Sequence, residues 1–207
     1  SRVSRGLGDV YKRQMFIRRY EMQHVVDMDL SKCFDKLDHE LILNSIKKRV
    51  TDSSVLELLK QFLESGVIVD GEWQRTEIGS PQGGVISPLI ANIYLDAFDQ
   101  EMRKRGHRIV RYADDILIFC RSRKGAENAQ AQATKILEEQ LKLRVNKTKS
   151  HIAHSDEGVK FLGIEIGSHY SRIQPKKMST FKGKLKRMTR RNGCLLYTSP
   201  SPRDTRE

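Results

Sequence analysis

The sequence predicts an α+β fold in which helices cover one face of an antiparallel sheet. Short apolar runs typical of strands alternate along the chain with longer stretches whose apolar residues recur at helical spacing. Two of these runs, residues 109–112 and 116–120, are so close that only an antiparallel hairpin can join them. The 207 residues suffice for one domain with additions.

The first elements are a strand and two helices. Residues 22–30 (MQHVVDMDL) form an apolar run broken by acids, which predicts a buried strand with Asp29 near its end. Asp38 is placed to cap a helix with an apolar stripe formed by Leu41, Ile42, Ile46 and Val50. Ser54 and Glu57 have capping-box spacing for a second helix, which Gly66 ends. The stripe predicted for this helix is Val55, Leu58, Leu59, Phe62 and Leu63.

A hairpin, a loop and a long helix follow. Residues 67–78 alternate like two strands around Asp70-Gly71, a favoured two-residue turn. Residues 79–84 (GSPQGG) have the composition of a loop. Ser87 is then predicted to cap a helix that has Pro88 at its first position and continues to about Arg105.

The remaining elements complete the predicted sheet. The hairpin of residues 109–120 has Ala113-Asp114-Asp115 at its tip, and the strand ending at Asp29 is its expected partner. Short strands are expected at Ile152 and over residues 159–166. Between them and the hairpin, a helix over about residues 124–141 should turn six residues inward: Ala126, Ala129, Ala133, Ile136, Leu137 and Leu141.

Composition narrows the class of protein. The chain is 38% hydrophobic and 31% charged, and none of its apolar runs approaches the roughly 18 residues that a membrane span needs. Its start lacks the plan of a signal peptide, so a membrane partner is not expected, and the expected compartment is the cytoplasm of a prokaryotic cell. The three cysteines are far apart and lack CxxC spacing, which argues against a disulfide framework and a zinc site.

The charge distribution indicates a polyanionic partner. The formal net charge is +12, and residues 172–191 contain nine Lys or Arg and no Asp or Glu. Because neutralised phosphates release condensed counterions, such clusters favour nucleic acid binding. A solvated basic face is the alternative.

The two ends differ from the rest of the chain. Residues 1–14 and 194–207 show no helical or strand periodicity and are rich in Ser, Arg, Gly and Pro, which predicts unstructured segments. Both also resemble translated adapter sequence at the ends of reading frames assembled from environmental DNA. Ordinary flexible tails are the alternative interpretation.

Three carboxylates carry the strongest chemical signal. Asp114 and Asp115 are adjacent in a tight turn between apolar strands, and a bound cation such as Mg²⁺ would offset their repulsion. An Asp-Asp turn by itself is more often a solvated turn that caps its own backbone. Asp29, at the end of a neighbouring strand, can bring a third acid to the same edge. Three acids there predict a two-metal site for nucleotidyl transfer, in which both ions span an in-line displacement.

Four sequence blocks, in order, resemble the palm of group II intron-encoded reverse transcriptases, the RNA-directed DNA polymerase and maturase family. DMDLSKCFDKLDH (27–39) resembles the opening palm motif, and RYADD (111–115) resembles the catalytic hairpin. TEIGSPQGGVISPLIANIYL (76–95) resembles the motif that positions nucleotide and template. LKLRVNKTKS (141–150) with KFLGIEI (160–166) resembles the last palm motifs, including the primer grip. The resemblance implies a right-hand polymerase palm over residues 15–174 and the start of a basic thumb helix over residues 175–193.

The resemblance also implies roles for individual residues. It implies two Mg²⁺ ions, with Mn²⁺ as a substitute, held by Asp29, the carbonyl of Leu30 and Asp114, with Asp115 as a supporting acid. Nucleotide-binding residues would be Phe34, as a steric gate against a ribose 2′-OH, together with Gln82 and Lys149. Primer and template contacts would come from Tyr112, Gly83, Phe161, Leu162 and Gly163. Core packing for Phe34 and Tyr112, a turn for Gly83 and an ordinary surface position for Lys149 are the alternatives.

The implied partners are an RNA template, a DNA primer, deoxynucleoside triphosphates and intron RNA. The family's fingers and the regions after the thumb have no counterpart in these 207 residues, so the chain is expected to be a fragment that is inactive alone. A non-catalytic RNA-binding or splicing module is one alternative. The reverse transcriptase of a retron, a diversity-generating element or a CRISPR-linked system is another.

Overall fold

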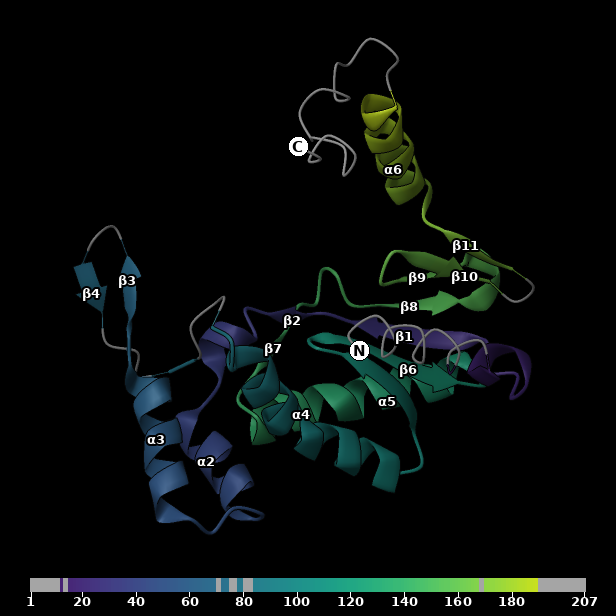
Figure 1. The fold of residues 1–207 in the computed structure, drawn as a ribbon. Helices are drawn as coiled ribbons and strands as arrows, with labels where there is room; N and C mark the ends of the chain where they lie inside the picture. Colours follow the sequence, from purple (N-terminus) through teal and green to yellow (C-terminus); the bar gives the residue numbers. More distant parts are fainter. Residues whose placement is uncertain are drawn as a thin grey trace, which may run out of the picture.

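The centre of the fold is a four-stranded antiparallel sheet (Figure 1). The computed structural model describes residues 12, 15–69, 72–74, 78–79, 84–167 and 170–189, with the backbone alone at 67–69 and 72–74. The strands lie in the order β5 (Arg108–Tyr112), β6 (Asp115–Cys120), β1 (His24–Met28) and β8 (His151–His154). The predicted pairing of the hairpin with the first strand is therefore confirmed.

Two helices cover one face of this sheet, as predicted. α4 (Ser87–Lys104) and α5 (Arg123–Lys135), which continues as a π-helical turn η2 (Ile136–Gln140), lie below the sheet in Figure 1. Val26 and Met28 of β1 and Ile116 and Ile118 of β6 belong to the hydrophobic core shared with these helices. All six residues that were predicted to point inward from the helix over residues 124–141 are buried. The α+β class is confirmed.

The opposite face of the sheet is covered by a smaller sheet. β9 (Val159–Phe161), β10 (Ile164–Ile166) and β11 (Ser171–Ile173) form three antiparallel strands. Val25, Val110, Leu117 and Phe119 form a second core with Ile17, Val159, Phe161 and Ile166. The segment predicted as strand over residues 159–166 is a hairpin, because Leu162 and Gly163 have φ of 50° and 82° and turn the chain.

The first strand is interrupted at Asp29. β1 ends at Met28, and the two-residue strand β2 (Leu30–Ser31) pairs with β7 (Arg144–Val145) instead of with β6. Asp29 therefore lies where the chain leaves one pair of strands for another, and its carbonyl accepts a hydrogen bond of 2.9 Å from the amide of Asn146. The predicted single strand over residues 22–30 is two strands with the acid between them.

Helix α2 (His39–Lys47) packs against α4, and α3 (Ser53–Glu64) packs against α2. Asp38 caps α2, as predicted. α3 is capped by Asp52 and not by Ser54, because the carboxylate of Asp52 accepts from the amides of Ser54 and Val55 and the helix begins at Ser53.

The predicted stripe of α3 is only partly correct. Leu63 is buried and Leu59 packs against the main core. Val55, Leu58 and Phe62 are 41%, 53% and 49% exposed, because α3 lies at the margin and has a packing partner on one side among the described residues. This face of the helix was wrongly predicted to point inward.

The described part of the segment between α3 and α4 contains a hairpin. β3 (Val67–Val69) and β4 (Glu72–Gln74) pair with Val69 opposite Glu72, which confirms the hairpin, while Asp70-Gly71 lie outside the described residues. Ser87 is the first residue of α4 and not its cap, because Ile86 already adopts right-handed helical angles. α4 ends at Lys104, close to the predicted end.

Helix α6 (Pro175–Met188) follows β11 and stands away from the central sheet in Figure 1. It has no buried residue. Among the described residues, no helix combines the length and the apolar character needed to cross a bilayer.

Candidate active site

The strand register brings the predicted acids to one edge of the sheet. Met28 is paired with Ile116, so Asp29 and Asp115 are the next residues on the two strands. Opposed residues of antiparallel strands share a face and side chains alternate, so Asp27 and Asp115 lie on the face that is turned away from α4 and α5. Asp29 directly follows Met28 and lies at the same end of this strand pair. Asp114 precedes Asp115 in the turn between β5 and β6.

The carboxylates affect one another electrostatically. Burial raises the pKa of Asp115, and the charges of Asp114 and Asp29 raise it further. Burial also raises the pKa of Asp27 to about 6. His151 acts to lower this pKa, whereas the charges of Asp115 and Asp29 raise it further. Together with the register of β1 and β6, these mutual influences indicate that the acids form one cluster.

Asp27 is an acid of this cluster to which the sequence analysis assigned no role. The sequence Asp27-Met28-Asp29 could have indicated this position, because residues two apart on a strand share a face. Asp27 lies opposite His151 of β8, which places an imidazole next to the cluster.

The segment after β7 holds Asp29 from the side. The amide of Asp29 donates to the Ser150 hydroxyl at 3.2 Å. The Lys149 ammonium lies 3.7 Å from the Asp29 carboxylate, and the Lys149 side chain is 68% exposed. The predicted nucleotide-binding lysine therefore lies beside the acid cluster and forms an ion pair with Asp29.

The cluster has the donor set of a partly built Mg²⁺ site. In the part of the chain that the structure describes, no group of three or more Asp, Glu, His or Cys side chains is arranged as a complete metal cage. Mg²⁺ at phosphate-handling sites uses one or two carboxylates and takes its other oxygens from water and substrate phosphates. Asp29 and Asp114 fit that pattern, and the backbone of Leu30 follows Asp29 directly.

A buried arginine supports the turn that carries Asp114. Arg111 donates from Nε and Nη2 to the two carboxylate oxygens of Asp99 at 2.9 and 2.7 Å. Its Nη1 donates to the Asn92 side chain at 2.9 Å and to the Ala113 carbonyl at 3.1 Å. The sequence analysis placed Arg111 in the RYADD motif but gave it no role. Its partners on α4 could not be predicted, because only the tertiary structure brings them close to it.

Phe34 directly follows Cys33, a residue that is influenced by the charge of Asp114. It begins the short helix η1 (Phe34–Lys36) and is partly buried against the main core. Burial raises the pKa of the adjacent Cys33 thiol to about 12, with a further contribution from the charge of Asp114. The segment of Phe34 and the turn of Asp114 are therefore neighbours. Tyr112, paired with Asp115, is 39% exposed at the edge of the sheet.

The loop that precedes α4 is anchored at Gly79. The Gly79 amide donates to the Leu37 carbonyl at 2.8 Å, and the His39 ring lies 2.6 Å from the Gly79 carbonyl. Gly79 has φ of 90°, and a Cβ there would lie 2.8 Å from the backbone of Asp35. The predicted nucleotide contacts Gln82 and Gly83 lie outside the described residues.

The predicted primer grip is the turn between β9 and β10. Phe161 is buried, whereas Leu162 and Gly163 are partly exposed. The carbonyl of Gly163 accepts a hydrogen bond of 3.0 Å from the amide of Gln174, the residue before α6. This hydrogen bond connects the turn to the residue that precedes α6.

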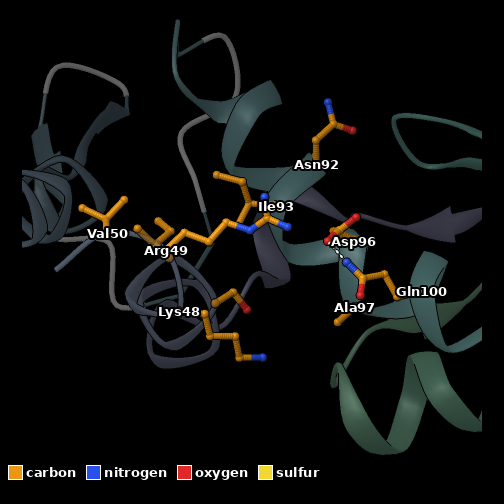
Figure 2. Close-up of a pocket in the computed structure, with 10 residues that line it drawn as sticks. Lys48, Arg49, Val50, Asn92, Ile93, Asp96, Ala97 and Gln100 are labelled. Atoms are coloured by element: carbon orange, nitrogen blue, oxygen red, sulfur yellow. Dashed lines mark hydrogen bonds between the residues drawn. The ribbon is translucent and has the colours of Figure 1, made fainter.

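A separate cavity of about 680 Å³ lies between the end of α2 and α4 (Figure 2). Lys48, Arg49 and Val50 line one side, and Asp96 and Gln100, joined by a hydrogen bond of 2.6 Å, line the α4 side. The cavity contains none of the predicted site residues. Asn92, which also lines it, accepts a hydrogen bond from Arg111.

The reverse transcriptase (RNA-dependent DNA polymerase) family model matches residues 5–166, which include every acid of the cluster. The chain belongs to the reverse transcriptase family. The chain is 31% identical over 176 residues to protein YkfC of Escherichia coli, covering 69% of this chain and 46% of that protein. It is 24% identical over 205 residues to the group II intron-encoded protein LtrA of Lactococcus lactis, covering 68% of this chain and 34% of LtrA. The resemblance to group II intron-encoded reverse transcriptases is confirmed, and the chain spans less than half of these relatives.

Solved structures support the same fold. A telomerase structure from Candida albicans, in complex with a fragment of telomeric RNA, superimposes with a TM-score of 0.65 at 14% identity. The superposition covers 84% of this reverse transcriptase chain and 34% of the telomerase chain. The palm-like arrangement of sheet and helices is therefore confirmed.

Proposed function

We propose that this chain is the catalytic palm of an RNA-directed DNA polymerase of the group II intron kind, which extends a DNA primer on an RNA template with deoxynucleoside triphosphates. The observation that carries the proposal is the β1 and β6 pairing, which brings Asp29 to the edge occupied by Asp114 and Asp115. Acids from separate strand ends, with a lysine beside them, suit the binding of metal-chelated phosphates.

In this proposal Asp29, Asp114 and the Leu30 carbonyl hold two Mg²⁺ ions, for which Mn²⁺ can substitute. When bound, the ions lower the pKa of the primer hydroxyl and offset charge on the phosphates. Asp115 supports the cluster, and burial together with the charges of Asp114 and Asp29 raises its pKa. Lys149 neutralises Asp29 in the free chain, and its exposed side chain is free to move to the leaving phosphates.

Phe34, Gln82 and Tyr112 complete the nucleotide and primer site in this proposal. Phe34, beside the turn of Asp114, excludes a ribose 2′-OH by steric clash. Gln82 and Gly83 contact the nucleotide and template from the loop that Gly79 anchors. Tyr112, exposed next to Asp115, contacts the primer end.

The turn of Phe161, Leu162 and Gly163 would hold the primer strand, and α6 would bind the duplex or intron RNA. α6 carries only basic charged side chains, all of them exposed. This feature also favours the second candidate, a non-catalytic RNA-binding or splicing module, because it would bind RNA without any need for the acids.

One substitution separates the two functions. In the full-length parent enzyme, Asp114→Asn should abolish primer extension in Mg²⁺ and in Mn²⁺, while affinity for RNA is retained, because a ligand is lost and the basic surface is not. Glu139→Gln, at a carboxylate that is 66% exposed on η2, is the matched control and should retain both activities. Unchanged primer extension by Asp114→Asn would leave only the RNA-binding module, and a comparable loss of RNA affinity would contradict the assigned role.

A further inference from the structure

The hairpin turn that carries Asp114 is in an unfavourable backbone conformation. Tyr112 and Asp115 are paired, so Ala113 and Asp114 form a two-residue loop. Ala113 has φ of 55°, a left-handed value that alanine rarely adopts because its Cβ crowds the backbone. Hairpin turns with positive φ at the first loop position normally have glycine there. Something outside the loop must hold this conformation.

The group that holds it comes from the other face of the sheet. Arg111 is paired with Ile116, so it projects toward the helices, whereas Asp115 projects to the opposite face. The side chain of Arg111 is only 8% exposed, and that of Asp99 is only 9% exposed. From this position the guanidinium reaches the carbonyl of Ala113.

The four hydrogen bonds of Arg111 connect the turn rigidly to α4. The bidentate contact with Asp99 fixes the plane of the guanidinium, and the Asn92 side chain fixes the direction of Nη1. Nη1 then donates to the Ala113 carbonyl, within the peptide that leads into Asp114. A lysine has no planar fork and cannot make these contacts together.

We infer that Arg111, Asp99 and Asn92 are positioning residues that hold the Ala113 turn in its left-handed conformation and thereby set the position of Asp114 against Asp29. We call these three side chains and the Ala113 carbonyl the Arg111 network. The inference rests on the proposed role of the two acids in metal binding. Without the network, the turn relaxes to conformations that alanine prefers, and the carboxylate of Asp114 moves away from its partner.

Hydrogen exchange on the full 207-residue chain tests the structural part. In EDTA, Arg111→Lys should make the amides of residues 112–115 exchange about tenfold faster, while the amides of α5 are unchanged. Glu101→Gln is the matched control, because it breaks the ion pair of Arg105 on the same helix but lies outside the network. Equal loss of protection throughout the sheet, or none in the turn, would overturn the inference.

Mn²⁺ binding, followed by electron paramagnetic resonance, tests the functional part. Arg111→Lys should weaken Mn²⁺ binding about tenfold, as loss of supporting hydrogen bonds does at other metal sites. Ala113→Gly removes the backbone strain, so Arg111→Lys should cost less affinity in the presence of Ala113→Gly than alone. Purely additive effects would show that Arg111 does not act through Ala113 and would overturn the inference.

A third variant separates this inference from the proposed function. Asp114→Asn should abolish Mn²⁺ binding outright if the acids bind metal. If it does so and Arg111→Lys leaves Mn²⁺ affinity unchanged, the Arg111 network is not a positioning device and the proposed function stands. If Asp114→Asn has no effect on Mn²⁺, the proposed function fails, and the inference, which rests on it, is overturned with it.

Discussion

Asp38 both caps helix α2 and forms an ion pair, and substitutions can separate the contributions of the cap and the ion pair to stability. Its Oδ1 accepts from the amides of Glu40 and Leu41 at 3.0 and 3.2 Å, while its Oδ2 accepts from the Lys142 ammonium at 2.6 Å. Asp52 caps α3 in the same way, with no lysine partner in the part of the chain that the structure describes. The two aspartates are therefore a matched pair.

The expected magnitudes follow from these contacts. Asp52→Ala should lower the free energy of unfolding by about 1 kcal/mol, the usual value of an N-cap. Asp38→Ala should cost more than Asp52→Ala, because it also removes an ion pair, and the difference should be small because the lysine of that pair is 64% exposed. Asp38→Asn keeps a capping oxygen and should lose only the ion-pair part, as should Lys142→Met.

Urea unfolding at several pH values measures these differences. The hydrogen bond from Lys142 and the capping amides hold the pKa of Asp38 below its ordinary value of 3.8. A carboxylate with a lowered pKa stabilises the fold above its unfolded pKa, and this stabilisation is lost as the pH falls through the folded pKa. The difference between wild type and Asp38→Asn should therefore be constant from pH 5 to 8 and shrink below about pH 4.

Two results would refute this reasoning. If Asp38→Ala and Asp52→Ala cost the same and Lys142→Met costs nothing, the ion pair contributes no stability. If Asp38→Asn is as costly as Asp38→Ala, the cap is not the source of the effect.

Three further predictions concern the loop, the nucleotide and the duplex. Gly79→Ala should destabilise the chain by about 2 kcal/mol more than Gly106→Ala in urea unfolding, because both have positive φ but only a Cβ at Gly79 meets backbone; equal losses would contradict this. In the full-length parent, Phe34→Ala should raise the ratio of ribonucleotide to deoxynucleotide incorporation, and an unchanged ratio with lower stability would indicate core packing alone. In filter binding, the 207-residue chain should bind primed RNA at low salt and lose affinity steeply as the salt concentration rises, because α6 alone among the described helices offers a strongly basic face. Binding that weak should not hold the primer in the geometry that the reaction needs, so the chain should not extend it. Mg²⁺-dependent extension that Asp114→Asn abolishes would refute this last expectation.

The parts of the fold that could be predicted depend on local signals. The strands of Asp29 and of the Asp114 hairpin were predictable because apolar runs with acids at their ends have few other structures open to them. The inward residues of α5 were predictable because a helix against a sheet buries one stripe. The order of the motifs predicted the family, which the match over residues 5–166 confirmed.

The parts that could not be predicted depend on contacts between distant segments. The exposure of Val55, Leu58 and Phe62 depends on which elements reach α3, and helical spacing carries no information about that. The break at Asp29 arises because Leu30 finds a partner at Val145, far along the chain. The roles of Gln82 and Gly83 remain predictions.

The partners of Arg111 could not be predicted for the same reason. Asp99 and Asn92 are ordinary polar residues of a helix until the sheet packs against it. Only the tertiary structure distinguishes them from the other polar residues of the same helix, such as Asp96 and Gln100, whose side chains bond to each other.

The central position of β1 determines when the chain can fold during synthesis. β1 is synthesised before its neighbours, residues 116–120 and 151–154, so its pairing must wait until these segments have been made. Until then Val25, Val26 and Met28, which are fully buried in the finished fold, lie on a strand with two unpaired edges. Such a strand is prone to aggregate, and its late, non-local pairing slows folding. A nascent chain released before residue 120 would therefore expose the strand that leads to Asp29, and that strand should bind a chaperone.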